Sequence, residues 1–245
     1  MGGTLSGKSA LVIGAGGLGG PVLLSLAAAG VGRIVLVDGD AVETSNLNRQ
    51  PLFGEADLGR RKAEAAAERL RRLHPGVRLE AHDRRFDPGN ALELTGTVDV
   101  VVDGSDNFAT KFLASDTAML ARRPLVHGGV LRYTAQVLTV VPGQTGCLRC
   151  LFEGPPPEGS VPSCADAGVL GALAGFAGAL MGAEALRLLA GDRGAYAGRM
   201  VIFEGRGART RLVPVRIRPS CPACGGVQGA TRPSAEPGAP QLPPT

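Results

Sequence analysis

A glycine-rich turn near the N-terminus constrains the fold of this chain more than any other feature. An apolar run that begins at Leu11 ends at Gly14, and Gly16 and Gly19 complete a G-x-G-x-x-G spacing ahead of an Ala- and Leu-rich segment that reaches Ala29. This order is typical of a strand, a tight turn and a helix whose N-terminal N–H groups bind phosphate.

A second apolar run supports a nucleotide site at this turn. It covers residues 33–37 and ends at Asp38, about 20 residues past the glycines, where a carboxylate can accept hydrogen bonds from ribose hydroxyls. The pattern predicts an adenosine nucleotide site and leaves open whether the ligand is ATP or a dinucleotide redox cofactor. A glycine-rich turn that binds nothing is the third possibility.

Expected strands and helices alternate along the rest of the first half of the chain. The strands cover residues 77–81, 98–102 and 124–128, and the helices cover residues 57–73, 91–94 and 108–121. This alternation predicts an α/β fold with a doubly wound, Rossmann-like, mostly parallel sheet. Further strands at 136–141, 199–204 and 210–217 predict a C-terminal antiparallel extension. We expect a single domain over residues 1–225 and a disordered Pro-rich tail over residues 226–245.

Charge and hydropathy limit the classes of partner. The net charge is +4 with a pI near 9.0, and the Arg-rich helical segment is most simply a solvated face, with an acidic partner as the alternative. The chain has no Trp and only two Tyr, so the aromatic side chains that stack on bases are scarce and we expect no nucleic-acid partner. The N-terminus shows no export signal, so we expect a cytoplasmic protein.

An uncharged, Gly- and Ala-rich stretch at residues 167–183 is the one candidate for a membrane span. It is shorter than the roughly 20 strongly apolar residues that a span needs. We therefore expect a buried helix or a subunit interface there, and no membrane association.

Polar side chains follow several of the expected strands, where ligands of open α/β sheets bind. They include two cations, Arg49 and Lys62, and the carboxylates of Asp38, Asp40, Asp103 and Asp106. Cations neutralise phosphate oxygens and a carboxylate can hold Mg²⁺, which are the needs of phosphate transfer. No histidine base is apparent, but a carboxylate substrate needs none, because its pKa of about 3.5 leaves it ionised at neutral pH.

Five cysteines make up the remaining candidate chemistry. Cys147 with Cys150 and Cys221 with Cys224 form two C-x-x-C knuckles that together predict a tetrahedral zinc site, with a redox pair or two unrelated pairs as alternatives. Cys164 lies outside the knuckles, in a loop before an expected helix start, where a helix N-terminus lowers a thiol pKa. It is either a reactive thiol or an ordinary loop cysteine.

These motifs, in this order, resemble the MoeB/ThiF/HesA branch of the ubiquitin-activating-type adenylyltransferases. The resemblance runs from about Leu5 to Cys224 and is carried by the glycine turn, Asp38, the segment 46–50, Lys62, the segment 103–107, both knuckles and the segment 162–168. It implies a nucleotide site built from Gly14, Gly16, Gly17, Gly19, Asp38, Asp40, Asn46, Arg49, Gln50, Lys62, Asp106 and Asn107.

The resemblance also implies roles for individual residues. Asp38 would bind the ribose, Arg49 and Lys62 the triphosphate, and Asp106 the Mg²⁺. The four knuckle cysteines would hold structural Zn²⁺, and Cys164 would match a cysteine that some members use for acyl or persulfide chemistry. Members of this family are usually homodimers that act on the C-terminal Gly-Gly of a small ubiquitin-like sulfur carrier protein.

The expected activity is therefore adenylation of the carrier's terminal carboxylate by ATP, giving acyl-AMP and pyrophosphate before thiocarboxylate formation. Alternatives are an NAD-dependent oxidoreductase, a nucleotide-binding module without catalysis, and an adenylating enzyme for another carboxylate in tRNA or peptide modification. Family members usually begin with a helix whose Arg reaches the partner's site, and some carry a rhodanese domain, but from this sequence we expect neither. We therefore expect a separate sulfur donor, a cysteine desulfurase or a rhodanese.

Overall fold

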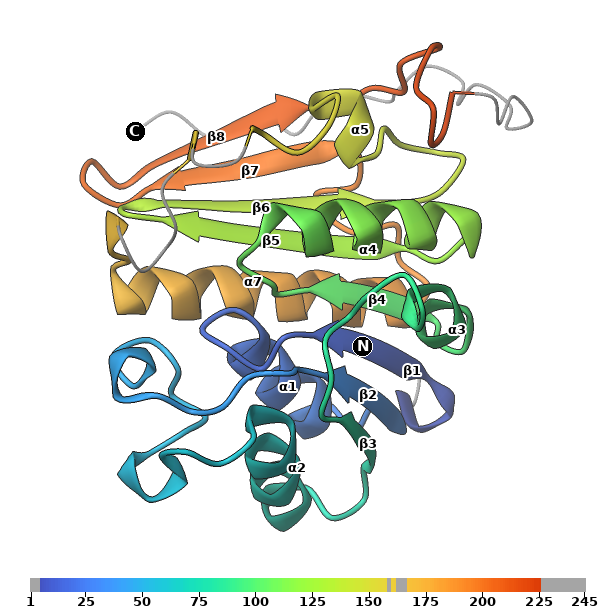
Figure 1. Ribbon diagram of the computed structural model, residues 1–245. Helices are drawn as coiled ribbons and strands as arrows, with labels where there is room; N and C mark the ends of the chain where they lie inside the picture. The colour runs from blue at the N-terminus through green and yellow to red at the C-terminus, as the bar shows by residue number, and fades with distance from the viewer. Residues whose placement is uncertain (1–4, 158–159, 162–166, 226–245) are drawn as a thin grey trace, which may run out of the picture.

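One eight-stranded mixed sheet forms the centre of the molecule in the computed structural model, which describes residues 5–157, 160–161 and 167–225 (Figure 1). The strand order is β3-β2-β1-β4-β5-β6-β7-β8. The first five strands in this order run parallel, and β6, β7 and β8 pair antiparallel. The strands are β1 Ser9–Ile13, β2 Arg33–Val37, β3 Arg78–His82, β4 Val100–Asp103, β5 Leu125–Leu131, β6 Thr134–Val140, β7 Arg199–Glu204 and β8 Arg209–Pro214. The predicted fold class, with its antiparallel extension, is confirmed.

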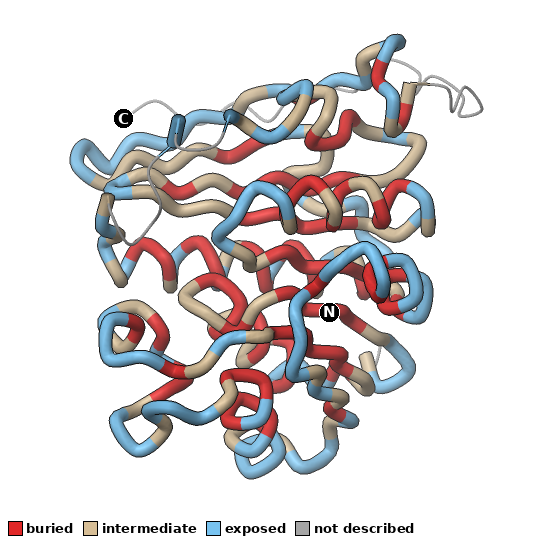
Figure 2. Tube along the Cα trace, viewed as in Figure 1, coloured by how far each residue is buried: buried red, intermediate tan, exposed pale blue. Residues whose placement is uncertain are grey.

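Helices cover both faces of this sheet, and each face has its own apolar core. The first core joins the sheet to α1 (Gly19–Ala28), α2 (Lys62–Leu73) and α7 (Gly171–Leu189). The second joins the opposite face to α3 (Ala91–Gly96), α4 (Phe108–Leu120) and α5 (Leu148–Leu151). Short 3-10 turns lie at Leu5–Gly7, Thr44–Asn46 and Glu55–Asp57. Figure 2 shows the buried residues concentrated in the strands and on the helix sides that face them.

Helix α7 contains most of the uncharged stretch that raised the question of a membrane span and continues through Glu184 and Arg187. It is the one helix in the described part of the chain that is long and apolar enough to cross a membrane, and half of its apolar window is buried in the fold. Its glycines allow close packing on α1, because a Cβ on Gly178 would lie 2.5 Å from the carbonyl oxygen of Leu18. The predicted helix is thus present and half buried in the fold, and the subunit interface that was the other prediction is untested.

Several predicted boundaries differ from the structure by a few residues, and two of the differences have a clear physical cause. The helix expected from residue 57 begins at Lys62, because residues 59–61 pair with residues 41–42 through backbone hydrogen bonds and Gly59 has a φ of +78°. The last strand ends at Pro214 instead of residue 217, since the N–H of Val215 donates to Gly198 and the chain turns toward the second cysteine knuckle. The division into a domain of residues 1–225 and a tail stays a prediction, because residues 226–245 lie outside the described part.

Candidate functional site

The sheet topology places a switch point beside the glycine turn. Strands β1 and β4 are neighbours, and the helices that follow them, α1 and α4, cover opposite faces. Ligands of open α/β sheets bind at such a switch point, at the carboxyl ends of the strands. The register sets Ile13, Asp103 and His127 side by side on β1, β4 and β5, so the residues that follow them share this edge.

The glycine turn is closely packed against its neighbours. Gly14 has a φ of +88°, and its N–H donates to the carbonyl oxygen of Val37 at 2.8 Å. A Cβ on Gly19 would collide with the carbonyl oxygen of Gly14, and one on Gly104 would lie 2.9 Å from the backbone nitrogen of Gly19. These contacts join the turn after β1 to the loop after β4. They also require glycine in both loops, because a Cβ on Gly19 or on Gly104 would come too close to backbone atoms of the glycine turn.

Asp38 is held at the same edge by backbone donors. Its carboxylate is buried and accepts from the N–H of Ala15 at 2.8 Å and from the N–H of Asp40 at 2.9 Å. Burial raises the pKa of Asp38, and these two hydrogen bonds together with nearby Lys62 partly offset that rise. The carboxylate is thus fixed against the glycine turn, where the ribose of a nucleotide lies in this class of fold.

Lys62 lies beside the two carboxylates that follow β2. It is the first residue of α2, its side chain is 8% exposed, and its Nζ lies 3.3 Å from Oδ2 of exposed Asp40. Because Lys62 is buried and its partner is exposed, a phosphate oxygen can replace Asp40 as the partner of the ammonium group. The structure therefore brings together Asp38, Asp40 and Lys62 as the sequence predicted.

The segment of residues 44–50 covers the glycine turn from the other side. Asn46 and Gln50 are buried, and the Gln50 amide nitrogen lies 3.4 Å from the Cβ position of Gly16. The Oε1 of Gln50 is buried without a hydrogen-bond partner among the described residues. Half-buried Arg49 donates from its guanidinium to the carbonyl oxygen of Ser45 at 2.8 Å. Its own carbonyl oxygen lies 3.0 Å from the Cβ position of Gly17.

A cavity of about 260 Å³ lies between this segment and the start of α7. Arg49 is its only charged lining residue, and the others are Leu47, Asn48, Pro51, Gly171, Ala172 and Gly175. The cavity thus adjoins the nucleotide edge through Arg49. The expected homodimer stays a prediction, and the uncharged exposed side of α7 next to this cavity is where we expect the contact.

Asp106 and Asn107 follow β4 on the loop that touches the glycine turn. Asp106 is exposed, and its carboxylate makes none of the hydrogen bonds or ion pairs found in the described part of the chain. A free carboxylate at this edge fits a Mg²⁺ ligand. Asn107 is the N-cap of α4, and its Oδ1 accepts from the N–H of Thr110 at 2.9 Å. Its side-chain oxygen is thus engaged within the helix, which leaves its amide nitrogen for a ligand.

Sequence reasoning missed a buried charged cluster behind this loop. Asp103 is fully buried, and its Oδ2 lies 2.8 Å from Nδ1 of His127 and 3.4 Å from Nζ of Lys111. Burial raises the pKa of Asp103, but Lys111 and His127 outweigh that effect and hold it well below its usual range. Burial and the Lys111 charge lower the pKa of His127. One signal was present in the sequence: a lysine, Lys111, on the buried side of an expected helix. Only the register of β4 and β5 shows that Asp103 and His127 lie side by side next to it.

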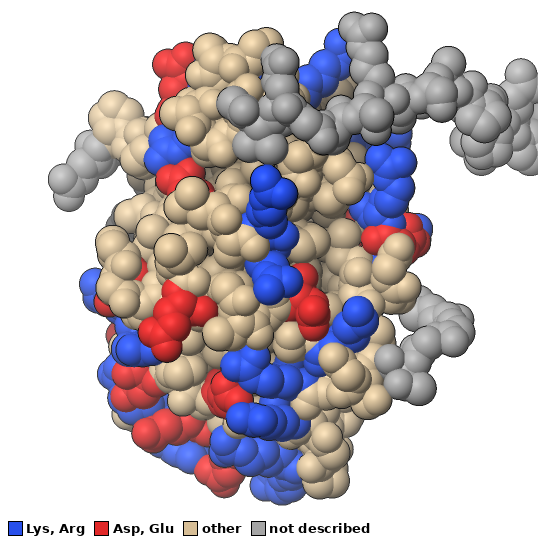
Figure 3. All heavy atoms as spheres, turned by 90° about the vertical axis from the view of Figure 1, so that its right-hand side faces the viewer, with Lys and Arg blue, Asp and Glu red and all other residues tan. Residues whose placement is uncertain are grey.

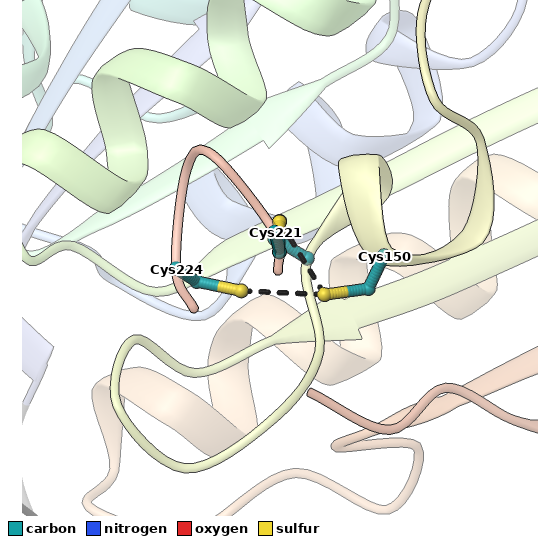
Figure 4. A group of neighbouring side chains, drawn as sticks. Cys150, Cys221 and Cys224 are labelled. Carbon is teal, nitrogen blue, oxygen red and sulfur yellow. Dashed lines mark hydrogen bonds between the residues drawn. The ribbon is translucent and has the colours of Figure 1, made fainter. Parts of the chain in front are cut away.

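The four knuckle cysteines gather on the far side of the sheet from α1. Their Sγ atoms all lie within 4.8 Å of one another, with Cys150 and Cys224 at 3.3 Å and Cys147 and Cys221 at 3.6 Å. Figure 4 shows the thiols of Cys150 and Cys224 pointing toward each other, with Cys221 beside them.

The geometry of this cysteine cluster fits one zinc ion. Four sulfur ligands at roughly 2.3 Å around one ion require sulfur separations of roughly 3.8 Å. The backbone N–H of Arg218 also donates to Sγ of Cys150 at 3.3 Å, as a group that supports a thiolate ligand would. Cys164 lies outside the described residues.

Basic and acidic side chains are interspersed on the face at the amino ends of the parallel strands (Figure 3). Just ahead of α2, Arg60 is ion-paired with Asp57 and Glu68, and Arg61 with Asp83. This agrees with the simpler explanation of the net charge, a solvated helix face.

Comparisons with known proteins place this geometry in a family. The model of the ThiF family matches residues 3–223. A sulfur carrier protein adenylyltransferase from Thermus thermophilus is 47% identical over 90% of this chain and 83% of the relative. A SAMP-activating enzyme E1 from Haloferax volcanii is 44% identical over 91% of this chain and 82% of the relative. A crystal structure of Escherichia coli MccB with ATP has a TM-score of 0.80 at 22% identity, over 91% of this chain and 67% of that one, which shows the shared fold.

Proposed function

This chain belongs to the ThiF family and is an adenylyltransferase of that type, and we propose that it activates the C-terminal Gly-Gly carboxylate of a small ubiquitin-like sulfur carrier protein. The observation that carries the proposal is that Asp38 and buried Lys62 lie together beside the glycine turn, whose backbone N–H at Ala15 donates to Asp38. The family membership favours ATP over the dinucleotide that the glycine pattern also allowed.

In the proposed reaction, a carboxylate oxygen of the carrier attacks the α-phosphorus of ATP. The bond from that phosphorus to the oxygen that bridges to the β-phosphate breaks, and pyrophosphate leaves with the bond's electron pair. Asp38 would bind the ribose hydroxyls, while Lys62 and Arg49 would neutralise charge on the triphosphate. No general base is required, because the attacking carboxylate is already ionised.

Two metal ions belong to the proposal. Asp106 would hold Mg²⁺, which would neutralise the negative charge that develops on the phosphate oxygens. The four knuckle cysteines would hold a structural Zn²⁺ that ties the segment after β6 to the segment after β8. Sulfur for the following step would come from a separate donor, with Cys164 as the candidate acyl or persulfide residue.

The test is ATP–pyrophosphate exchange with the cognate carrier present. We expect Lys62→Ala to lose roughly 10²–10³ in exchange rate, the usual cost of removing one group that stabilises transition-state charge. The matched control is Lys8→Ala, which removes an exposed lysine ahead of β1 and should leave the rate unchanged. Exchange by Lys62→Ala at the rate of the control would contradict the assigned site.

A further inference from the structure

In the buried cluster of Asp103, His127 and Lys111, the histidine and the lysine share one oxygen of the Asp103 carboxylate. Both His127 and Lys111 lie against Oδ2 of Asp103. Lys111 is fixed in turn, because its Nζ donates to the carbonyl oxygen of Gly128 at 2.6 Å. The cluster thus ties β4, α4 and β5 together at the level where β4 ends.

The other oxygen of the same carboxylate shapes the loop that carries Asp106. Oδ1 of Asp103 accepts from the N–H of Ser105 at 3.0 Å and from its hydroxyl at 2.6 Å. Gly104, between them, packs against the glycine turn. Asp106 makes none of the side-chain contacts found in the described part of the chain, so its position comes from these neighbours.

We propose that Asp103, clamped by His127 and Lys111, is a positioning residue that holds the Asp106 loop in place for the metal–nucleotide complex. The clamp on Oδ2 fixes the direction of the carboxylate, and Oδ1 then sets the turn at Ser105 that leads to Asp106. This inference rests on the proposed function, since it assigns a role to residues around the proposed Mg²⁺ ligand. A cluster that only satisfies buried charges would stabilise the fold without affecting metal affinity.

Metal affinity therefore separates the two roles. We would measure the midpoint for Mn²⁺ binding to the protein–ATP complex by electron paramagnetic resonance, with no carrier present. Asp103→Asn removes the charge that balances Lys111 and should raise this midpoint roughly tenfold or more, as loss of a group that orients a metal ligand does. Binding of ATP without metal should change far less.

The matched control is Glu184→Gln. Glu184 is a buried carboxylate on α7, at the opposite face, and accepts hydrogen bonds from Thr139 at 2.8 Å and from the N–H groups of Ala195 and Tyr196. Its replacement should lower the melting temperature and leave the Mn²⁺ midpoint unchanged. If Asp103→Asn does not fold, Ser105→Ala, which removes only the hydroxyl bond to Asp103, should still raise the midpoint.

The possible outcomes distinguish a failure of the positioning role of Asp103 from a failure of the proposed adenylation. Wild-type protein that binds Mn²⁺ with ATP, while the Asp103 or Ser105 variant keeps the wild-type midpoint, would overturn the positioning role alone. Wild-type protein that binds no Mn²⁺–ATP would overturn the proposed nucleotide chemistry and this inference with it.

Discussion

Asp38 illustrates what could be predicted at the scale of single residues. Its position could be predicted because it directly follows β2 and because the turn after β1, from which it accepts a hydrogen bond, is marked in the sequence by its glycines. Its ribose-binding role stays a prediction. The two knuckles were found from their spacing, and Lys62 was selected as one of the polar side chains expected near the strand ends. The Asp103 cluster was not, because its three members come from β4, α4 and β5 and meet only through the register of the sheet.

The lowered pKa of His127 predicts how stability depends on pH. Folded protein keeps this histidine neutral below its ordinary pKa of 6.5, because burial and Lys111 oppose the charged form. The unfolded chain takes up a proton there, so the free energy of unfolding falls as the pH drops through and below that value.

His127→Asn keeps a donor for Asp103 and has no proton to take up. In urea denaturation it should lose less stability than wild-type protein between about pH 7 and pH 5. His74→Asn, at the end of α2, is the control and should behave as wild type. An equal pH dependence in wild type and His127→Asn would show that this histidine is not held neutral.

At the scale of elements, apolar runs bounded by glycines were predicted well, and boundaries set by long-range pairing were not. β2 occupies the predicted residues 33–37. The start of α2 was missed because residues 59–61 pair with residues 41–42, which no local pattern indicates.

Packing between α1 and α7 gives an element-scale prediction with a built-in control. A Cβ on Gly178 would lie 2.5 Å from the Leu18 carbonyl oxygen, so Gly178→Ala should destabilise the protein by roughly 1–3 kcal/mol, as overpacking does. A Cβ on Gly175, in the same helix, meets nothing within 4 Å, so Gly175→Ala should be neutral or stabilising by roughly 0.5–1 kcal/mol. Chemical denaturation of both variants checks the order, and equal effects would contradict this packing.

The cysteine cluster gives a second element-scale prediction. Protein purified without chelator should hold one zinc ion per chain, and Cys221→Ser should lose it and melt at a much lower temperature, because structural zinc contributes on the order of 10 kcal/mol to folding. Elemental analysis and thermal denaturation measure both effects. Cys164→Ser, outside the cluster, should keep its zinc. A zinc-free wild-type protein would rule out the metal clasp.

For the whole molecule, the alternation of strands and helices predicted the doubly wound sheet, and the sheet order explains the position of the site. The chain reverses its winding between β1 and β4, and the carboxyl ends of β1, β4 and β5 point to the left in Figure 1, where the segment of residues 39–61 lies to the left of β1 and β2. That arrangement gathers the glycine turn, Asp38, Lys62 and the Asp106 loop at one edge. The sequence alone left the nucleotide open, because a glycine turn with an acidic residue after β2 serves both ATP and dinucleotides.

The most direct test of the proposed activity is whether exchange depends on the carrier's tail. ATP–pyrophosphate exchange would be measured with the intact carrier and with a carrier that lacks its terminal Gly-Gly, each with and without Mg²⁺. The proposed activity predicts exchange, and a carrier–AMP adduct by mass spectrometry, only with the intact tail and Mg²⁺. Equal exchange with the truncated carrier, or no exchange with either, would contradict it.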